Sequence, residues 1–200
     1  MATRRVLLVA CGALVREVRG VLGQLADLDV DVEYLPANLH NRPEQITGAV
    51  CAVLDGAAAR GYDHVAVAYG DCGTGGRLDA ALAERGVARL AGAHCYEFLA
   101  GSAVFHALQD AEPGTFYLTD YLARTFDALV IGGLGLDRHP ELRDLYFGHY
   151  HRLVHLAQTD SVELDAAARA AADRLGLAHE RRSTGLGPFR SELERILEVA

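Results

Sequence analysis

Short apolar runs that alternate with longer helical patterns constrain this chain more than any other feature. Mainly apolar runs of four to six residues stand at 5–10, 30–35, 64–69, 87–91, 116–119 and 128–131. Between them, apolar residues recur every three or four positions, as they do along an amphipathic helix. This alternation predicts a mainly parallel sheet with helices on both faces. The expected fold is α/β, a Rossmann-like three-layer sandwich.

The predicted helices fill the intervals between the apolar runs and most of the C-terminal third. They are expected at 14–25, 46–60, 78–85, 102–109, 140–158, 161–175 and 188–199, with a short one between 119 and 128. Ser102 is the expected N-cap of its helix. His149, His151 and His155 are then expected on a surface helix.

Length and charge set the class of protein. The 200 residues contain no Pro/Ser-rich linker and no repeat, so residues 1–200 are expected to form a single α/β domain. The formal net charge of −8 disfavours nucleic acid and membrane surfaces as partners. The apolar stretch before Cys11 is shorter than the roughly 7–15 residues of a signal peptide. We therefore expect a cytoplasmic protein with thiols rather than disulfides.

Three of the four cysteines follow predicted strands. Cys11 ends the first run, Cys72 follows the third, and Cys95 follows the run at 87–91. Ligands of parallel sheets bind at the carboxyl ends of the strands, so these thiols are expected at one edge. Cys51 lies within a helical pattern and is interpreted as a small buried residue. The alternative is that Cys11, Cys72 and Cys95 are three separate buried thiols at strand ends.

Three converging thiolates form a soft ligand set, which suits zinc or a [4Fe-4S] cluster better than magnesium or calcium. The predicted metal ligands are Cys11, Cys72 and Cys95. Three protein ligands leave one coordination position open, as a catalytic metal requires. His94 precedes Cys95 and is the candidate fourth ligand, which would close the site.

The glycine-rich segment after Tyr69 is a candidate cofactor-binding loop. Gly73, Gly75 and Gly76 are expected to let the backbone approach a metal or a substrate closely. The segment has no Lys and does not match the phosphate-loop pattern, and Asp71 would repel a phosphate.

A second polar constellation is the segment 135–140. Arg138 is a candidate for holding a substrate carboxylate, and Asp137 and His139 are candidates for proton transfer. Glu97 is a further candidate base. The alternative is a polar loop in which Asp137 caps a helix that starts near Pro140.

Several motifs together resemble one family. They are Cys11-Gly12-Ala13-Leu14, the segment 69–76, His94-Cys95-Tyr96-Glu97-Phe98 and the segment 133–142. They are similar to a bacterial and archaeal domain-of-unknown-function family. The resemblance implies a genetic setting beside corrinoid-dependent methyltransferases that act on methylamines or betaines, and so a role in one-carbon metabolism.

The leading hypothesis is a metal-dependent enzyme, a transferase or lyase, that acts on a small molecule. One alternative is a non-catalytic accessory protein that handles a metal or a corrinoid for a partner methyltransferase. Another is a metal-free thiol enzyme with Cys72 or Cys95 as nucleophile. The apolar stretch Leu145-Tyr146-Phe147-Gly148 is expected either in the core or at the contact of a homo-oligomer.

Overall fold

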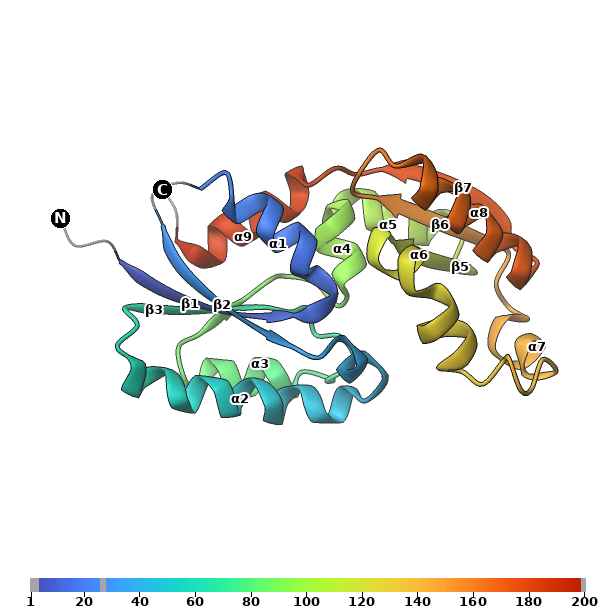
Figure 1. The fold of residues 1–200 in the computed structure, drawn as a ribbon. Coiled ribbons are helices and arrows are strands. Elements are labelled where there is room, and N and C mark those ends of the chain that lie inside the picture. The colour runs from blue at the N-terminus through green and yellow to red at the C-terminus, as the bar shows by residue number, and fades with distance from the viewer. Residues whose placement is uncertain (1–3, 26–27, 199–200) are drawn as a thin grey trace. The chain divides into compact units, whose positions relative to one another are not determined.

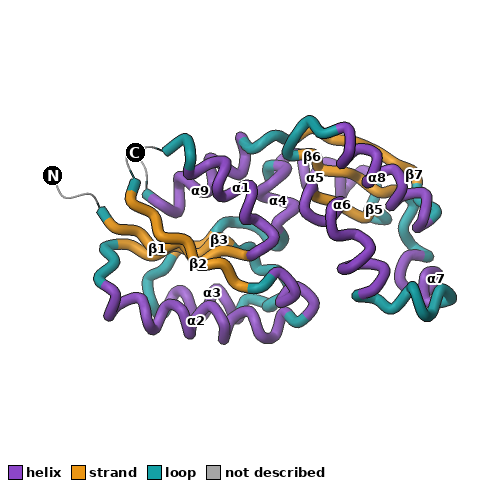
Figure 2. The backbone as a smooth tube through the Cα atoms, viewed as in Figure 1, coloured by secondary structure: helices purple, strands orange, loops and turns teal. Residues whose placement is uncertain are grey.

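The strands are divided between two separate parallel sheets (Figure 2). They belong to a computed structural model that describes residues 4–25 and 28–198. The chain divides into two compact units. The first contains the described residues up to Phe98 and those from Leu186 onward, and the second is Leu99–Gly185.

The sheet of the first unit has the strand order β2-β1-β3-β4, all parallel. Its strands are β1 (Arg5–Cys11), β2 (Asp29–Leu35), β3 (His64–Ala68) and β4 (Ala88–Arg89). Its helices are α1 (Val15–Leu22), α2 (Ile46–Ala57), α3 (Arg77–Ala83) and α9 (Gly187–Leu197). Short 3-10 turns occupy Gly12–Leu14, Ala37–Asn41, Pro43–Gln45 and Ala58–Arg60. Helix α4 (Cys95–Ala100) begins in this unit and continues into the second.

Helices cover both faces of this sheet, because β1 and β3 are apolar on both sides. Helices α2 and α3 lie on one face, and α1 and α9 lie on the other (Figure 1). Leu7, Val9 and Val67 pack with Ile46 of α2 and Leu78 of α3 in one buried cluster. This arrangement leaves the ends of the strands as the places where loops can gather polar groups.

The second unit repeats the three-layer arrangement around a smaller parallel sheet of order β5-β6-β7. Its elements are α5 (Ser102–Ala111), β5 (Thr115–Thr119), α6 (Asp120–Phe126), α7 (Leu142–Phe147), β6 (Arg152–Ala157), α8 (Val162–Leu175) and β7 (Ala178–Ser183). Leu118 and Leu153 pack with α6 and α8 on one face. On the other face the ring of Tyr117 lies 5.1 Å from that of Phe105 in α5.

The fold class is confirmed: the chain is a Rossmann-like α/β protein whose strands are parallel within each sheet and flanked by helices. The strands form two sheets, however, and not the one sheet that the alternation suggested. The prediction that residues 1–200 form a single domain stays a prediction, because two compact units in one chain can still unfold together. No described helix is long and apolar enough to cross a membrane.

The strand predicted at 128–131 is wrong. These residues belong to a π-helical segment, Asp127–Gly132, that continues α6. Phe126 and Val130 recur at helical spacing and both face the α8 side of the core. Four apolar residues were too short a run to separate a strand from the end of a buried helix.

The continuous helix predicted at 140–158 is also wrong, because it contains β6. The histidines expected on its surface lie elsewhere, and His155 is a fully buried residue of that central strand. The strand β7 was not predicted, because it carries the polar sequence Ala-His-Glu-Arg-Arg-Ser at the sheet edge. Gly101, and not Ser102, occupies the N-cap of α5. Residue 199, the last of the predicted helix 188–199, lies outside the described residues.

Candidate functional site

Three thiols gather at the carboxyl edge of the sheet in the first unit. Cys11 is the last residue of β1, Cys72 follows β3, and Cys95 is the first residue of α4 after β4. Because β1, β3 and β4 are parallel neighbours, these chain positions fall at the same edge. The rule that parallel sheets present their ligand sites there makes this the leading candidate site.

The thiols influence one another electrostatically. Cys11 and Cys72 pack in one cluster with Tyr69. Burial raises the pKa of Cys72 to about 11, and the neighbouring Cys11 adds to the shift. Burial likewise raises the pKa of Cys95 well above its ordinary value, with Cys72 and then Cys11 as further causes. Each thiolate would therefore oppose the formation of the next.

Cys11 and Tyr69 complete the same environment. Burial raises the pKa of Cys11, although the Ala13 N–H and the Tyr69 hydroxyl both act to lower it. Burial, followed by the charge of Cys11, raises the pKa of Tyr69 strongly. The Tyr69 hydroxyl is buried and has no partner of ordinary hydrogen-bond geometry among the described residues. It is an available donor beside two thiols.

Backbone N–H groups point at each thiol. The N–H groups of Gly70 and Cys95 lower the pKa of the Cys72 thiol, against the effect of burial. The N–H groups of Tyr96 and Cys95 lower the pKa of the Cys95 thiol in the same way. Hydrogen bonds from N–H groups to sulfur stabilise thiolates and tune the metals that thiolates bind.

The backbone at Cys72 is unusual. Cys72 has φ 49°, in the left-handed region, where residues other than Gly and Asn are rare. Two hydrogen bonds hold it there: the Cys72 N–H donates to Ala93 O over 2.8 Å, and the Asp71 N–H donates to Gly92 O over 3.1 Å. A strained conformation persists only where its surroundings fix it, and such residues concentrate at functional sites.

Asp71 organises the glycine-rich loop from within. Its Oδ1 accepts from Thr74 Oγ1 over 2.6 Å and from the Gly76 N–H over 2.8 Å, and its Oδ2 accepts from the Gly75 N–H over 3.1 Å. The hydrogen bond from Thr74 does most to lower the pKa of Asp71, and the two glycine amides lower it further. The carboxyl group of Asp71 therefore stays ionised. Two of the amides that a phosphate would need are thus already bonded to a carboxylate. The cofactor-binding role predicted for Gly73, Gly75 and Gly76 stays a prediction.

Two further predicted residues lie beside the cysteines. Glu97 Oε2 accepts from the Ala93 N–H over 3.0 Å and so helps to fix the turn before Cys95. His94 is solvent-exposed. Burial lowers the pKa of His40, and the charge of the nearby His94 lowers it further. The imidazoles of His40 and His94 therefore lie near each other. The roles of His94 as a ligand and of Glu97 as a base stay predictions.

Among the described residues, no three His, Cys, Asp or Glu side chains are arranged so that they could hold a metal ion as they stand. The three thiols are therefore close enough to interact electrostatically without forming a preassembled coordination sphere. Binding of a metal would require their side chains to turn toward a common point.

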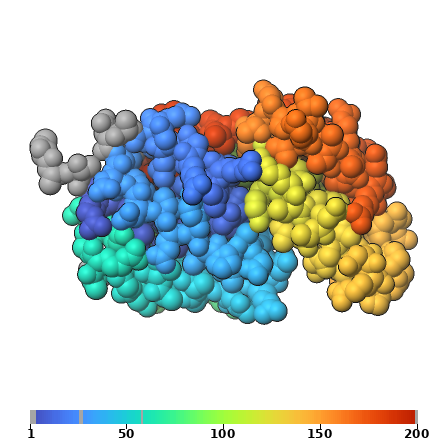
Figure 3. Space-filling model, in the orientation of Figure 1, coloured from blue at the N-terminus to red at the C-terminus, as the bar shows by residue number. Residues whose placement is uncertain are grey.

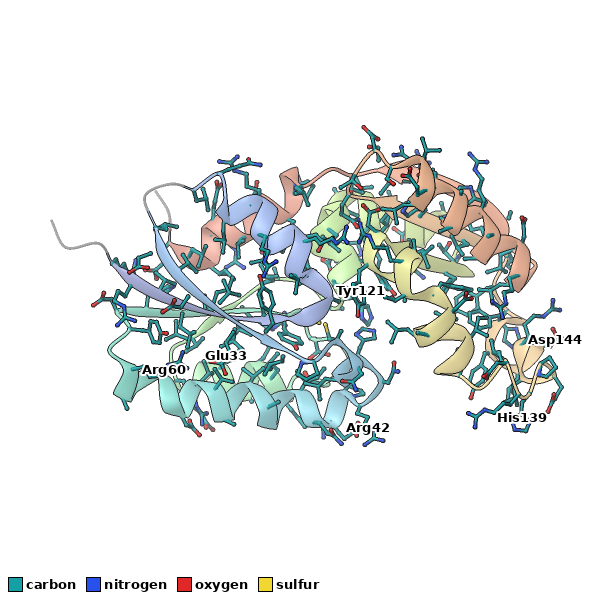
Figure 4. All side chains as sticks on the ribbon, viewed as in Figure 1. Glu33, Arg42, Arg60, Tyr121, His139 and Asp144 are labelled. Atoms are coloured by element: carbon teal, nitrogen blue, oxygen red, sulfur yellow. The ribbon has the colours of Figure 1, made fainter. Side chains whose placement is uncertain are left out.

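Asp137, Arg138 and His139 lie in the second unit. All three are exposed; Arg138 Nε lies 3.8 Å from Asp137 Oδ1, and His139 Nδ1 lies 3.2 Å from Glu141 Oε1. Figure 4 marks His139 and Asp144 near α7, and Figure 3 shows this yellow-to-orange part of the chain open to solvent. Asp137 caps no helix, since α7 begins at Leu142 after Glu141. Their catalytic roles stay predictions.

The second unit also contains a buried polar network that sequence reasoning missed. Asp120, the first residue of α6, has Oδ1 3.0 Å from His155 Nε2, and its Oδ2 accepts from Thr159 Oγ1 over 2.6 Å. Burial would raise the pKa of Asp120, but the hydrogen bonds from His155 and Thr159 lower it overall. His155 Nδ1 lies 3.4 Å from Asp165 Oδ1, so the ring stands between two carboxylates. The one sequence signal was Asp120 at the end of a predicted strand.

Residues 34–193 match the sequence profile of the family described as protein of unknown function (DUF1638). The chain belongs to this family. The match includes Cys72, Cys95 and the whole second unit, whereas Cys11 precedes it. A comparison with curated proteins gives no match.

Proposed function

We propose that the first unit carries a metal-dependent active site in which Cys11, Cys72 and Cys95 bind zinc or a [4Fe-4S] cluster. The observation that supports this most strongly is the mutual electrostatic coupling of three thiols, one buried and two half-buried, at the ends of three neighbouring parallel strands. A cation placed among them offsets both the burial of the thiolates and their repulsion. Three protein ligands would leave one position for a small substrate, where the metal supplies Lewis-acid activation.

The pKa directions favour a metal over a metal-free thiol nucleophile. A nucleophilic cysteine needs a lowered pKa, because the thiolate is the reactive form. Burial instead raises the pKa of Cys11, of Cys72 to about 11, and of Cys95. Without a cation the three thiols stay protonated near neutral pH, and binding of a metal releases their protons.

The other residues of the edge have defined tasks in this proposal. The N–H groups that point at Cys72 and Cys95 stabilise their thiolates. The buried Tyr69 hydroxyl donates a hydrogen bond to a thiolate of Cys11. Glu97 holds the Ala93 N–H and thereby the turn that carries Cys95. Substrate recognition by Arg138 and proton transfer by Asp137 or His139 belong to the same proposal, as does a substrate from one-carbon or methylamine metabolism.

The test is anaerobic purification followed by an absorbance spectrum and metal analysis of the same sample. An absorbance band near about 400 nm with stoichiometric iron and sulfide indicates a cluster, and zinc without a visible band indicates a thiolate site. Cys72→Ala is expected to lose the metal, while Cys51→Ala, which removes the half-buried thiol of α2, is expected to keep it. Metal-free protein after reconstitution, or full loading of Cys72→Ala, would overturn the proposal.

His94→Ala separates an enzyme from an accessory protein. If His94 is not a ligand, the variant keeps its metal, and an exogenous thiol or azide changes the spectrum of the cobalt-substituted protein by binding at the open position. Loss of metal from His94→Ala, together with no spectral response of the parent protein, indicates a closed four-ligand site. That result would favour a role in holding or delivering a metal.

A further inference from the structure

Arg89, the last residue of β4, has a side chain that is 15% exposed and forms hydrogen bonds through all three guanidinium nitrogens. Its Nε and Nη2 donate to the two carboxylate oxygens of Asp79 in α3 over 2.7 and 2.8 Å. Its Nη1 donates to Leu90 O over 2.6 Å and to Gly92 O over 3.1 Å. A planar group with donors in a fixed fork makes such a set of bonds, whereas the ammonium of Lys does not.

The carbonyl of Gly92 connects Arg89 to the thiol site. It accepts from Arg89 and from the Asp71 N–H, and the next carbonyl, Ala93 O, accepts from the Cys72 N–H over 2.8 Å. The turn that Arg89 closes therefore holds the backbone of Cys72 in its strained conformation. The same turn leads directly into Cys95, so one side chain fixes the loops of two of the three cysteines.

Helix α9 holds the turn from the other side. Arg195 Nη2 donates to Arg89 O over 3.0 Å, and Glu192 Oε2 accepts from the Ala91 N–H over 3.1 Å. Side chains of β4 and of α9 thus hold the same turn.

We propose that Arg89, oriented by Asp79, is the positioning residue of the thiol site: it fixes the turn that leads from β4 into Cys95 and that holds the backbone of Cys72. This inference rests on the proposed function for its metal readout. Arg89 itself would touch neither the metal nor the substrate.

The experiment compares Arg89→Met, Arg89→Lys and the control Arg85→Met. Arg85 makes a similar ion pair, 3.0 Å from Asp55, away from the cysteine loops. Removal of groups that orient metal ligands typically lowers affinity about 10- to 100-fold. Arg89→Met is expected to lose zinc affinity by about that factor. Arg89→Lys is expected to restore little of the affinity, because an ammonium keeps the charge but cannot form the forked set of bonds to Asp79, Leu90 O and Gly92 O.

A second readout does not depend on metal. In metal-free protein, alkylation of Cys72 by iodoacetamide, followed by peptide mass spectrometry, is expected to be several-fold faster in Arg89→Met than in Arg85→Met, because loosening of the turn exposes a thiol that is otherwise buried. Equal zinc affinities and equal alkylation rates in the two Met variants would overturn the inference while leaving the proposed function intact. Failure of the parent protein to bind metal would overturn the proposed function, and the alkylation rates would then decide the role of Arg89 alone.

Discussion

Asp120 and His155 form a carboxylate–imidazole pair that is completely removed from solvent, with 3.0 Å between Oδ1 and Nε2. The two residues belong to different elements, α6 and β6, and Thr159 closes the other side of the carboxylate. The pair ties the start of a helix to the central strand of the second sheet. It also explains why a histidine is tolerated in the middle of a buried strand.

Asp120→Ala is expected to destabilise the protein by about 3–5 kcal/mol, because it leaves His155 and Thr159 without their buried partner. The control is Asp144→Ala. Asp144 pairs with Arg143 at 2.7 Å but is 79% exposed, so its loss should cost at most about 1 kcal/mol. Urea denaturation followed by circular dichroism measures both. Similar midpoints for the two variants would contradict the role assigned to the buried pair.

Gly12→Ala and Gly48→Ala should change stability in opposite directions. A Cβ at Gly12 would lie 2.8 Å from Leu35 O and 3.2 Å from Ala37 N, so backbone would have to move beside Cys11. We expect a loss of about 1–3 kcal/mol. A Cβ at Gly48 in α2 meets nothing within 4 Å and should add about 0.5–1 kcal/mol. Thermal unfolding of both variants tests the close packing at Gly12, and equal melting temperatures would refute it.

The raised thiol pKa values predict a loss of stability at alkaline pH in reduced, metal-free protein. Cys72 has a pKa of about 11 in the folded chain, whereas an unfolded thiol ionises near about 8.5. Between these values the unfolded state releases the proton first, so stability is full below about pH 8.5 and falls as the pH rises. The slope should approach about 1.4 kcal/mol per pH unit for each such thiol. Cys72→Ala should show a shallower decline in urea titrations between about pH 8 and 10, and an unchanged slope would contradict the shift.

A single unfolding transition is expected, as the prediction of one domain over residues 1–200 requires. The division between the units falls at Phe98–Leu99, within α4, so one continuous helix belongs to both. Differential scanning calorimetry should give equal calorimetric and van't Hoff enthalpies. Two resolved transitions would show that the units are separate domains.

The sequence predicted those helices and strands whose own residues show a clear pattern. Strand β1 is buried on both faces and reads as a continuous apolar run, and α8 has both a Ser161 N-cap and a Gly176 after its end. The edge placement of Cys11, Cys72 and Cys95 needed only the positions of strand ends and the rule for parallel sheets.

The parts that the sequence did not predict depend on partners distant in the chain. His155 is compatible with a buried strand only because Asp120 and Asp165 lie on either side of it. Strand β7 is polar because it is an edge strand whose Arg181 bonds to Asp165 of α8. No sequence pattern indicated the turn around Arg89, because the Arg89 side chain bonds to backbone carbonyls and to the carboxylate of Asp79 in α3.

The position of α9 sets an order for synthesis of the protein. This helix follows the second unit in the chain, yet it buries Phe189 and Leu193 in the first unit and holds the turn around Arg89 through Arg195 and Glu192. A nascent chain on the ribosome therefore completes the second unit before it can finish the first. Until α9 has emerged from the exit tunnel, the three cysteines lack part of their support. Maturation of the thiol site therefore waits for synthesis of the whole second unit.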